Sequence, residues 1–126
     1  MTKLGIIGAM RIEVETLLDK MENVTMTKHA WSEYYEGTLE GLDVVVVQCG
    51  VGKVNAAICA QTLCNCFEIT HLVNTGIAGS LCADLDIGDL VVSMDAMYHD
   101  FDCTGFGYPK GQVPGTNLTA FPADEQ

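Results

Sequence analysis

The sequence predicts an α/β fold with a mostly parallel sheet and helices outside it. Two short apolar runs, Leu4–Ala9 and Leu42–Cys49, have the unbroken hydrophobicity of strands that are buried on both faces. Each run is followed by a longer segment with the character of a helix, and glycines mark the turns between strand and helix. Strands that alternate with helices in this way are typical of a parallel sheet.

The first half of the chain predicts one strand, one helix and a hairpin. The strand Leu4–Ala9 turns at Gly8-Ala9-Met10 into a helix over Met10–Met21. That helix is supported by an apolar stripe at helical spacing, made of Val14, Leu17, Leu18 and Met21. Loose alternation then predicts two hairpin strands, Val24–Trp31 and Glu33–Leu39, before the turn at Gly41 and the buried strand that follows it.

The second half predicts a buried helix, two more strands and a long loop region. Lys53–Phe67 is apolar nearly all round, so we expect a helix that is buried on more than one side. Short strands are expected over Thr70–Thr75 and Asp89–Met97, and the chain is loop-like after Tyr98. Phe121-Pro122 followed by acidic residues is how a helix begins, and we therefore expect the chain to be the N-terminal part of a larger protein.

Length and charge restrict the number of domains and the kind of partner. The 126 residues fit a single α/β domain spanning 1–126. Seventeen acidic residues against six basic ones give a net charge of −11, which argues against nucleic-acid and anionic-membrane binding. The apolar runs are too short for a membrane span. With no export signal, the six cysteines indicate reduced, buried thiols in a cytoplasmic protein.

Three glycine-rich turns follow predicted strands. They are Gly8-Ala9-Met10, Gly50-Val51-Gly52 and Gly76-Ile77-Ala78-Gly79. Ligands of parallel α/β folds bind at the carboxyl ends of strands, where small residues let backbone amides approach a ligand. One such turn alone is better explained by tight chain reversal, but three at one end favour a site. None fits the dinucleotide-binding pattern GxGxxG.

Two acidic features are candidates for chemistry. Glu13 lies just inside the first helix, where the helix dipole stabilises a carboxylate and where a general base could act on water. His99 with Asp100 and Asp102 could contribute metal ligands, but adjacent residues on an extended segment point to opposite faces. A hydrogen-bonded loop cluster is therefore favoured over a metal site, and no metal or cofactor is predicted.

Taken together, these motifs resemble the nucleoside phosphorylase/nucleosidase superfamily. The resemblance rests on Leu4–Met10 followed by Glu13-Val14, on Gly50–Ala57 and on Asn74–Gly79. Further motifs are similar to the 5′-methylthioadenosine/S-adenosylhomocysteine nucleosidase family within it: Tyr98–Asp102, Phe106–Tyr108, Gly111-Gln112 and Pro114-Gly115. The family implies a three-layer αβα sandwich around a mixed, mostly parallel sheet, a homodimer, and no cofactor. It also implies hydrolysis of the N-glycosidic bond of both nucleosides, which releases adenine and the 5′-thio-ribose for nucleoside catabolism and methionine salvage.

The resemblance also assigns roles to individual residues. Glu13 would be the catalytic carboxylate that activates water. The other family positions would bind the substrate. Ala9, Met10 and Val51 would line the pocket, and Ile77, Ala78 and Gly79 would form a floor under ribose and base. Cys103 and Phe106 would approach the adenine or the 5′ group, and Pro114 would reach into the partner subunit's 5′-alkylthio pocket.

Three departures from the family leave alternatives open. Ile77 stands where some members carry serine, and Arg11-Ile12 replaces acidic residues, which raises a phosphate-dependent phosphorylase as an alternative. A phosphate site needs several donors, however, and the chain has no other arginine. In the family, the acid that protonates the purine comes from the C-terminal half, so we expect this chain alone to be nearly inactive. A non-catalytic nucleoside-binding or dimerising module and a small metalloprotein are the remaining alternatives.

Overall fold

The structure is a computed structural model that describes residues 1–125. The chain divides into two compact units, Met1–Gly79 and a second unit that begins at Ser80. The first unit holds the main sheet and both α-helices, and the second holds a short two-stranded ladder and a single 3-10 turn. The two units are described separately below, and the single domain expected over 1–126 stays a prediction.

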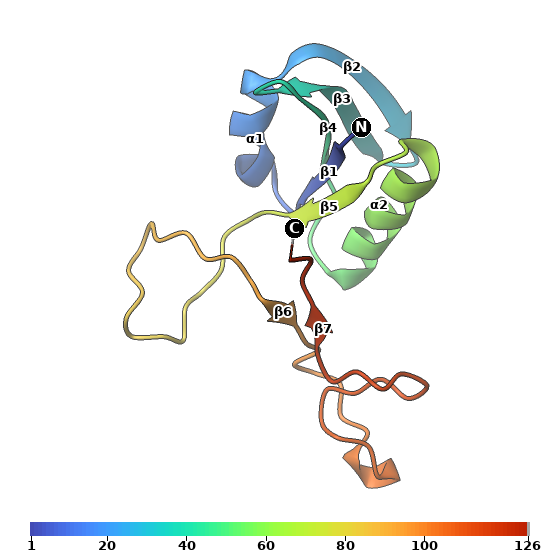
Figure 1. Cartoon of the computed structure of the whole chain (residues 1–126), viewed down its shortest axis with the longest axis vertical. Helices are drawn as coiled ribbons and strands as arrows, with labels where there is room; N and C mark the ends of the chain where they lie inside the picture. Colours follow the sequence, from blue (N-terminus) through green and yellow to red (C-terminus); the bar gives the residue numbers. More distant parts are fainter. Residues whose placement is uncertain (126) are drawn as a thin grey trace. The chain divides into compact units, whose positions relative to one another are not determined.

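The first unit is built on a five-stranded mixed sheet with the order β2-β3-β4-β1-β5 (Figure 1). Three neighbouring strands run parallel, namely β4 (Leu42–Gln48), β1 (Lys3–Gly8) and β5 (His71–Asn74). The other two, β2 (Glu22–His29) and β3 (Ser32–Leu39), form an antiparallel hairpin that joins the sheet through β4. The mixed, mostly parallel sheet and its hairpin are therefore confirmed.

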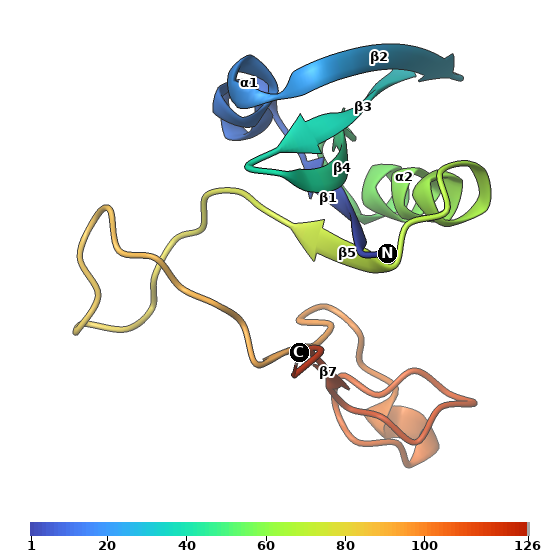
Figure 2. The same ribbon diagram turned by 45° about the horizontal axis from the view of Figure 1, so that its top comes forward.

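The two helices cover opposite faces of this sheet (Figures 1 and 2). One face packs against α2 (Lys53–Cys66) through a buried cluster that includes Ile7, Val45, Val47 and Leu63. The other face packs against α1 (Arg11–Lys20) through Ile6, Val14, Met21, Val44 and Val46. Because successive side chains of a strand point to opposite faces, the continuous valine run of β4 serves both clusters. This is the three-layer α/β/α arrangement.

Burial of α2 differs from the expectation. Its sheet-facing residues Cys59 and Leu63 are buried, but Val54 is 73% exposed and Ile58 is 40% exposed. The expectation of burial on more than one side is therefore wrong in this structure, because within Met1–Gly79 the helix packs on the sheet through one side only. The expectation of buried thiols is also only partly correct, since Cys49 and Cys59 are buried while Cys64, Cys66 and Cys82 are exposed.

The second unit contains less regular structure than the sequence predicts. The strand expected over Asp89–Met97 is reduced to β6 (Asp95–Ala96), which pairs antiparallel with β7 (Phe121–Pro122). Pro122 thus lies in a strand, and no helix starts there within the described residues; Gln126 lies outside them. A 3-10 turn, η1 (Thr104–Phe106), interrupts the loop region. Neither helix of residues 1–125 combines the length and the apolarity that crossing a membrane requires.

Candidate active site

The carboxyl ends of β4, β1 and β5 lie side by side and carry the three glycine-rich turns. The residues that follow β4 and β5 are still joined to β1 by backbone hydrogen bonds. The Cys49 amide donates to the Gly8 carbonyl, and the Thr75 amide donates to the Ile7 carbonyl, each at 2.9 Å. Three segments therefore leave the sheet side by side at the carboxyl ends of its parallel strands: Ala9-Met10, Gly50-Val51 and the segment from Gly76 onward. The structure brings the predicted turns to the position where ligands bind in α/β folds.

Glu13 connects two of these turns. Its Oε2 accepts a hydrogen bond from the backbone amide of Met10 at 2.8 Å, which caps the start of α1. Its Oε1 accepts a hydrogen bond from the backbone amide of Ile77 at 3.1 Å, although 64 positions separate the two residues. The carboxylate is thus held between the turn after β1 and the turn after β5.

Gly76 makes room for this carboxylate. A Cβ atom at position 76 would lie 2.5 Å from Glu13 Oε1 and 2.9 Å from its carboxyl carbon. Real side-chain contacts essentially never reach such distances. A larger residue would therefore displace either the carboxylate or the turn that carries the Ile77 amide. The glycine is required here by a close approach.

The hydrogen bonds favour the ionised form of Glu13. The Met10 amide, followed by the Ile77 amide, lowers the pKa of the Glu13 carboxyl below its ordinary value of 4.5. Desolvation raises the same pKa but does not outweigh them. The group is therefore ionised at neutral pH. A carboxylate has about four acceptor positions, so two backbone bonds leave capacity for a water molecule. The arrangement is suited to polarising water as a general base.

The other residues assigned by resemblance divide between the two units. Ala9, Met10, Val51, Ile77, Ala78 and Gly79 belong to the turns at the sheet edge, and Val51 and Ile77 are among the most exposed apolar side chains of the first unit. Cys103, Phe106 and Pro114 belong to the second unit. There, Phe106 and Pro114 are exposed and Cys103 is half-buried. Their roles at the substrate stay predictions.

The His99–Asp102 segment has the hydrogen bonds of a loop. Asp102 Oδ1 accepts from the Thr104 amide at 3.0 Å and from the Thr104 hydroxyl at 2.7 Å, and these bonds lower the pKa of the Asp102 carboxyl. His99 Nδ1 lies 3.9 Å from Asp100 Oδ1. Over residues 1–125, no three His, Cys, Asp or Glu side chains are grouped so that they could hold a metal ion.

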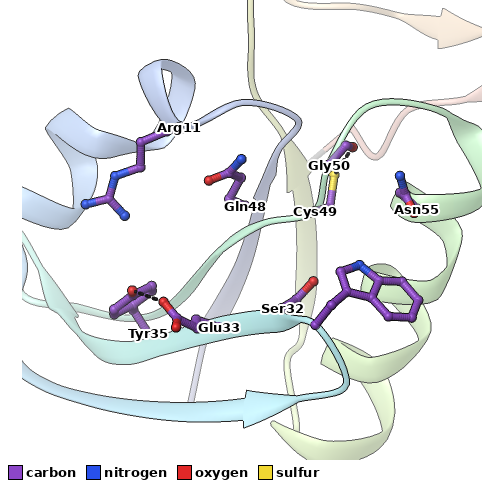
Figure 3. Close-up of a pocket in the computed structure, with 9 residues that line it drawn as sticks. Arg11, Ser32, Glu33, Tyr35, Gln48, Cys49, Gly50 and Asn55 are labelled. Atoms are coloured by element: carbon purple, nitrogen blue, oxygen red, sulfur yellow. Dashed lines mark hydrogen bonds between the residues drawn. The ribbon is translucent and has the colours of Figure 1, made fainter.

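The sequence analysis missed a polar hollow of about 280 Å³ beside the β1–α1 turn (Figure 3). Residues of α1, β3, β4 and α2 line it, together with residues of the β2–β3 and β4–α2 turns. Among them are Arg11, Trp31, Glu33, Gln48 and Cys49. One sequence signal could have pointed to it. The chain has a single arginine and a single tryptophan, and both line this hollow. Their proximity depends on the register of the hairpin, which the sequence pattern does not reveal.

Comparison with known proteins places these features in a family context. Residues 3–126 match the sequence profile of the phosphorylase superfamily. The 5′-methylthioadenosine/S-adenosylhomocysteine nucleosidase of Colwellia psychrerythraea is 46% identical over 123 residues, covering 98% of this chain and 51% of the relative. The enzyme of the same name from Halalkalibacterium halodurans is 49% identical over 114 residues, covering 90% of this chain and 49% of the relative. The chain spans about half the length of the curated relatives it matches.

Solved structures give the same result for the fold. The crystal structure of the Colwellia psychrerythraea nucleosidase in complex with adenine has a TM-score of 0.95 and covers 98% of this chain and 51% of that one. The Neisseria meningitidis nucleosidase in complex with methylthio-immucillin-A has a TM-score of 0.94 at 38% identity, covering 99% of this chain and 54% of that one. The α/β fold derived above is therefore shared with proteins that bind adenine-type ligands.

Proposed function

The chain belongs to the phosphorylase superfamily, and from that premise we propose that it supplies the water-activating side of a nucleosidase active site. The proposed reaction is hydrolysis of the N-glycosidic bond of 5′-methylthioadenosine and S-adenosylhomocysteine, which gives adenine and the 5′-thio-ribose. The observation that carries the proposal is the ionised Glu13 carboxylate, held by the Met10 and Ile77 amides at the carboxyl edge of the sheet.

The geometry suggests how Glu13 would act. Cleavage of a glycosidic bond passes through an oxocarbenium-like sugar, and water attacks the face opposite the leaving group. Glu13 would accept a hydrogen bond from that water and take its proton as the new C–O bond forms and the C–N bond to adenine breaks. The departing adenine would be protonated by the acid that the family resemblance assigns to the C-terminal half. The two backbone amides keep the carboxylate in place without a flexible side-chain partner, which limits the reorganisation needed during the reaction. Ile77, Ala78 and Gly79 would support the ribose and base beside it.

The partner and the location of the protein are part of the proposal. We propose a homodimer in which Cys103, Phe106 and Pro114 contact substrate, with Pro114 reaching the pocket of the partner subunit. The similarity of the chain to nucleosidases supports this assignment. We also propose that the protein is located in the cytoplasm.

The proposal is tested by two measurements on the purified chain. Adenine release from 5′-methylthioadenosine is measured without phosphate, and binding of the same nucleoside is followed through the Ile77 amide signal by NMR. We expect the nucleoside to shift the Ile77 signal, and any adenine release to be independent of phosphate. Because the purine-protonating acid is expected from the C-terminal half of the family, we expect this chain alone to release adenine only slowly. Glu13→Gln, which removes the base, should reduce that residual release to the background rate.

Glu15→Gln is the matched control. Glu15 lies on the same helix, is exposed, and loses the same charge in the variant. Its adenine release should equal that of the wild-type chain. Release that requires phosphate would favour the phosphorylase alternative. An unchanged Ile77 signal at saturating nucleoside, together with no release, would reject the proposed site.

A further inference from the structure

The turns after β1 and β4 are held by side chains at equivalent positions of the helices that follow them. In α1 the third helical residue is Glu13, which reaches back and accepts a hydrogen bond from the Met10 amide. In α2, whose N-cap is Gly52, the third helical residue is Asn55. Its side-chain Nδ2 donates to the backbone carbonyl of Val51 at 2.8 Å. One helix therefore uses an acceptor at this position, and the other uses a donor.

Asn55 also packs against the first residue of the turn after β4. A Cβ atom at position 50 would lie 3.1 Å from Asn55 Nδ2, which is tighter than nine in ten real Cβ contacts. Gly50 and Gly52 have φ values of 85° and 105°, in the left-handed region that glycine tolerates. In Figure 3 the Asn55 side chain lies on the first turn of α2 and faces Gly50. Asn55 thus contacts two consecutive residues of a turn whose backbone depends on glycine.

Three successive carbonyl groups of this turn each accept one hydrogen bond. The Gly50 carbonyl accepts from Cys49 Sγ at 3.2 Å. The Val51 carbonyl accepts from Asn55, and the Gly52 carbonyl accepts the first backbone hydrogen bond of α2 at 3.1 Å. Because the C=O and N–H groups of a trans peptide point in opposite directions, each bond also sets the direction of the amide that follows. Of the three bonds, the one from Asn55 joins the turn to the helix through a side chain.

The turn after β4 lies next to Glu13. The Cys49 amide donates to the Gly8 carbonyl at 2.9 Å, so the chain that leaves β4 runs beside the chain that leaves β1. Burial raises the pKa of the Cys49 thiol, and the charge of Glu13 adds to the rise. Val51 follows two residues later and is 72% exposed. Its side chain is therefore open to a ligand that is bound at Glu13.

The residue type at position 55 supports a role in holding the turn. An acidic residue is favoured in the first turn of a helix because it stabilises the positive end of the helix dipole. The first turn of α2, which the structure describes in full, has no acidic residue. A carboxylate at position 55 could not donate to the Val51 carbonyl, whereas the asparagine amide does. The bond to the turn therefore explains a residue that helix stability alone does not.

We propose that Asn55 is a positioning residue for the nucleoside. It holds the Gly50-Val51-Gly52 turn in the conformation that places Val51 against the substrate, and it does not touch the substrate itself. The inference rests on the proposed function and adds a residue to which the family resemblance gives no role. Without the bond, the turn would hold the binding conformation for only part of the time, and the apparent affinity would fall in proportion to that fraction.

Two aspartate substitutions on the same helix separate positioning from stability. Asn55→Asp keeps the shape of the side chain, removes the donor to Val51, and adds a favourable acidic residue to the first turn of α2. Asn65→Asp makes the same change of charge near the C-terminal end of α2, where a negative charge is unfavourable. Asn65 accepts a hydrogen bond from Gln61 through Oδ1, and aspartate can keep that bond. The first variant therefore weakens the turn, and the second weakens only the helix.

The experiment measures nucleoside binding and stability for each variant. Binding of 5′-methylthioadenosine is followed through the Ile77 amide signal by NMR, and stability is measured by urea unfolding. We expect Asn55→Asp to weaken binding by about threefold to tenfold, as for the loss of one hydrogen bond, with little change in the urea midpoint. Asn55→Ala removes the donor without adding charge and should weaken binding to a similar degree. Asn65→Asp should bind like the wild-type chain although its urea midpoint is lower.

The outcomes distinguish failure of the inference from failure of the proposed function. If the wild-type chain binds the nucleoside and both Asn55 variants bind it equally well, the nucleoside site stands and the inference is rejected. If Asn55→Asp and Asn65→Asp weaken binding equally, charge or helix stability controls binding, and the inference is also rejected. If the nucleoside leaves the Ile77 signal of the wild-type chain unchanged, the proposed function fails, and the role of Asn55 in nucleoside binding fails with it.

Discussion

Glu13 combines a structural role with its proposed chemical role, and both depend on the same two hydrogen bonds. By accepting from Met10 it satisfies an amide at the start of α1 that has no partner within the helix. By accepting from Ile77 it fixes the turn that follows β5. The Glu13 carboxylate is therefore both the proposed general base and a group that stabilises the site. Its contribution to stability can be measured through its dependence on pH.

We predict that Glu13 titrates below its ordinary value of 4.5. Because the pKa is lower in the folded chain than in the unfolded chain, ionised Glu13 stabilises the fold above the unfolded value, and this stabilisation is lost as pH falls through the folded value. The measurement is a carboxyl-carbon NMR titration, together with thermal unfolding from pH 7 to pH 3. Glu13→Gln should lose less stability over that range than Glu15→Gln. A Glu13 pKa at or above 4.5 would contradict the prediction.

We predict that Gly76→Ala disables the carboxylate without removing it. The added methyl would lie 2.5 Å from Glu13 Oε1, so either the carboxylate or the turn must move. We expect the carboxylate to leave the Ile77 amide, because it is the far end of a flexible side chain. The pKa of Glu13 should rise toward its ordinary value. The residual adenine release of the chain should fall toward the background rate, since a displacement of about 1 Å can cost a catalytic group on the order of a hundredfold. Gly105→Ala is the control, since a Cβ there meets nothing within 4 Å. An unchanged Glu13 titration in Gly76→Ala would show that the turn accommodates the methyl.

At the residue scale, the sequence indicated which group could be a base but not how it is held. The position of Glu13 in the first helical turn follows from the sequence, and so does the glycine after β5. The contact between them depends on β5 pairing with β1, which connects residues far apart in the chain. The requirement for glycine at position 76 is therefore a tertiary property.

At the scale of elements, local sequence patterns predicted the buried strands correctly. They failed where the formation of a strand depends on a pairing partner elsewhere in the chain. The strand β4 and the hairpin were predictable from the sequence. A continuous valine run indicates a strand that is buried on both faces, and apolar–polar alternation indicates the strands of a hairpin. The segment Asp89–Met97 has a similar apolar pattern, yet Val91 and Val92 are exposed and only Asp95–Ala96 finds a partner strand. A strand requires hydrogen-bond partners for its backbone N–H and C=O groups, and the apolar pattern of one segment does not indicate whether a partner strand is present.

The β3–β4 hairpin offers a test of stability at this scale. Its two turn residues, Glu40 and Gly41, both have positive φ values, 49° and 80°, as in a type I′ turn. Glutamate is a poor residue for that conformation, and asparagine adopts it more readily. Glu40→Asn should therefore stabilise the fold by about 0.5–1 kcal/mol, measured by urea unfolding. Gly41→Ala should destabilise it by about 1 kcal/mol or more. The same sign for both variants would contradict the assigned turn.

At the scale of the whole molecule, two properties act against each other in solution. The net charge of −11 makes copies of the chain repel one another. Apolar side chains on the first unit favour association, because Val73 of the edge strand β5 is 41% exposed and α2 presents Val54 and Ile58. Salt distinguishes the two effects, since it screens the repulsion and leaves apolar contacts intact.

We therefore predict self-association that increases with protein concentration and also with salt. Between about 0.1 M and 1 M salt the screening length falls from about 10 Å to about 3 Å, so sedimentation velocity should show a larger share of oligomer at the higher salt. Val73→Lys should reduce association, because it places a charge on the exposed edge strand. Thr16→Lys adds the same charge on the exposed side of α1 and should have little effect. Association that weakens with salt would mean that ion pairs hold the copies together, and the apolar edge would then have no part in it.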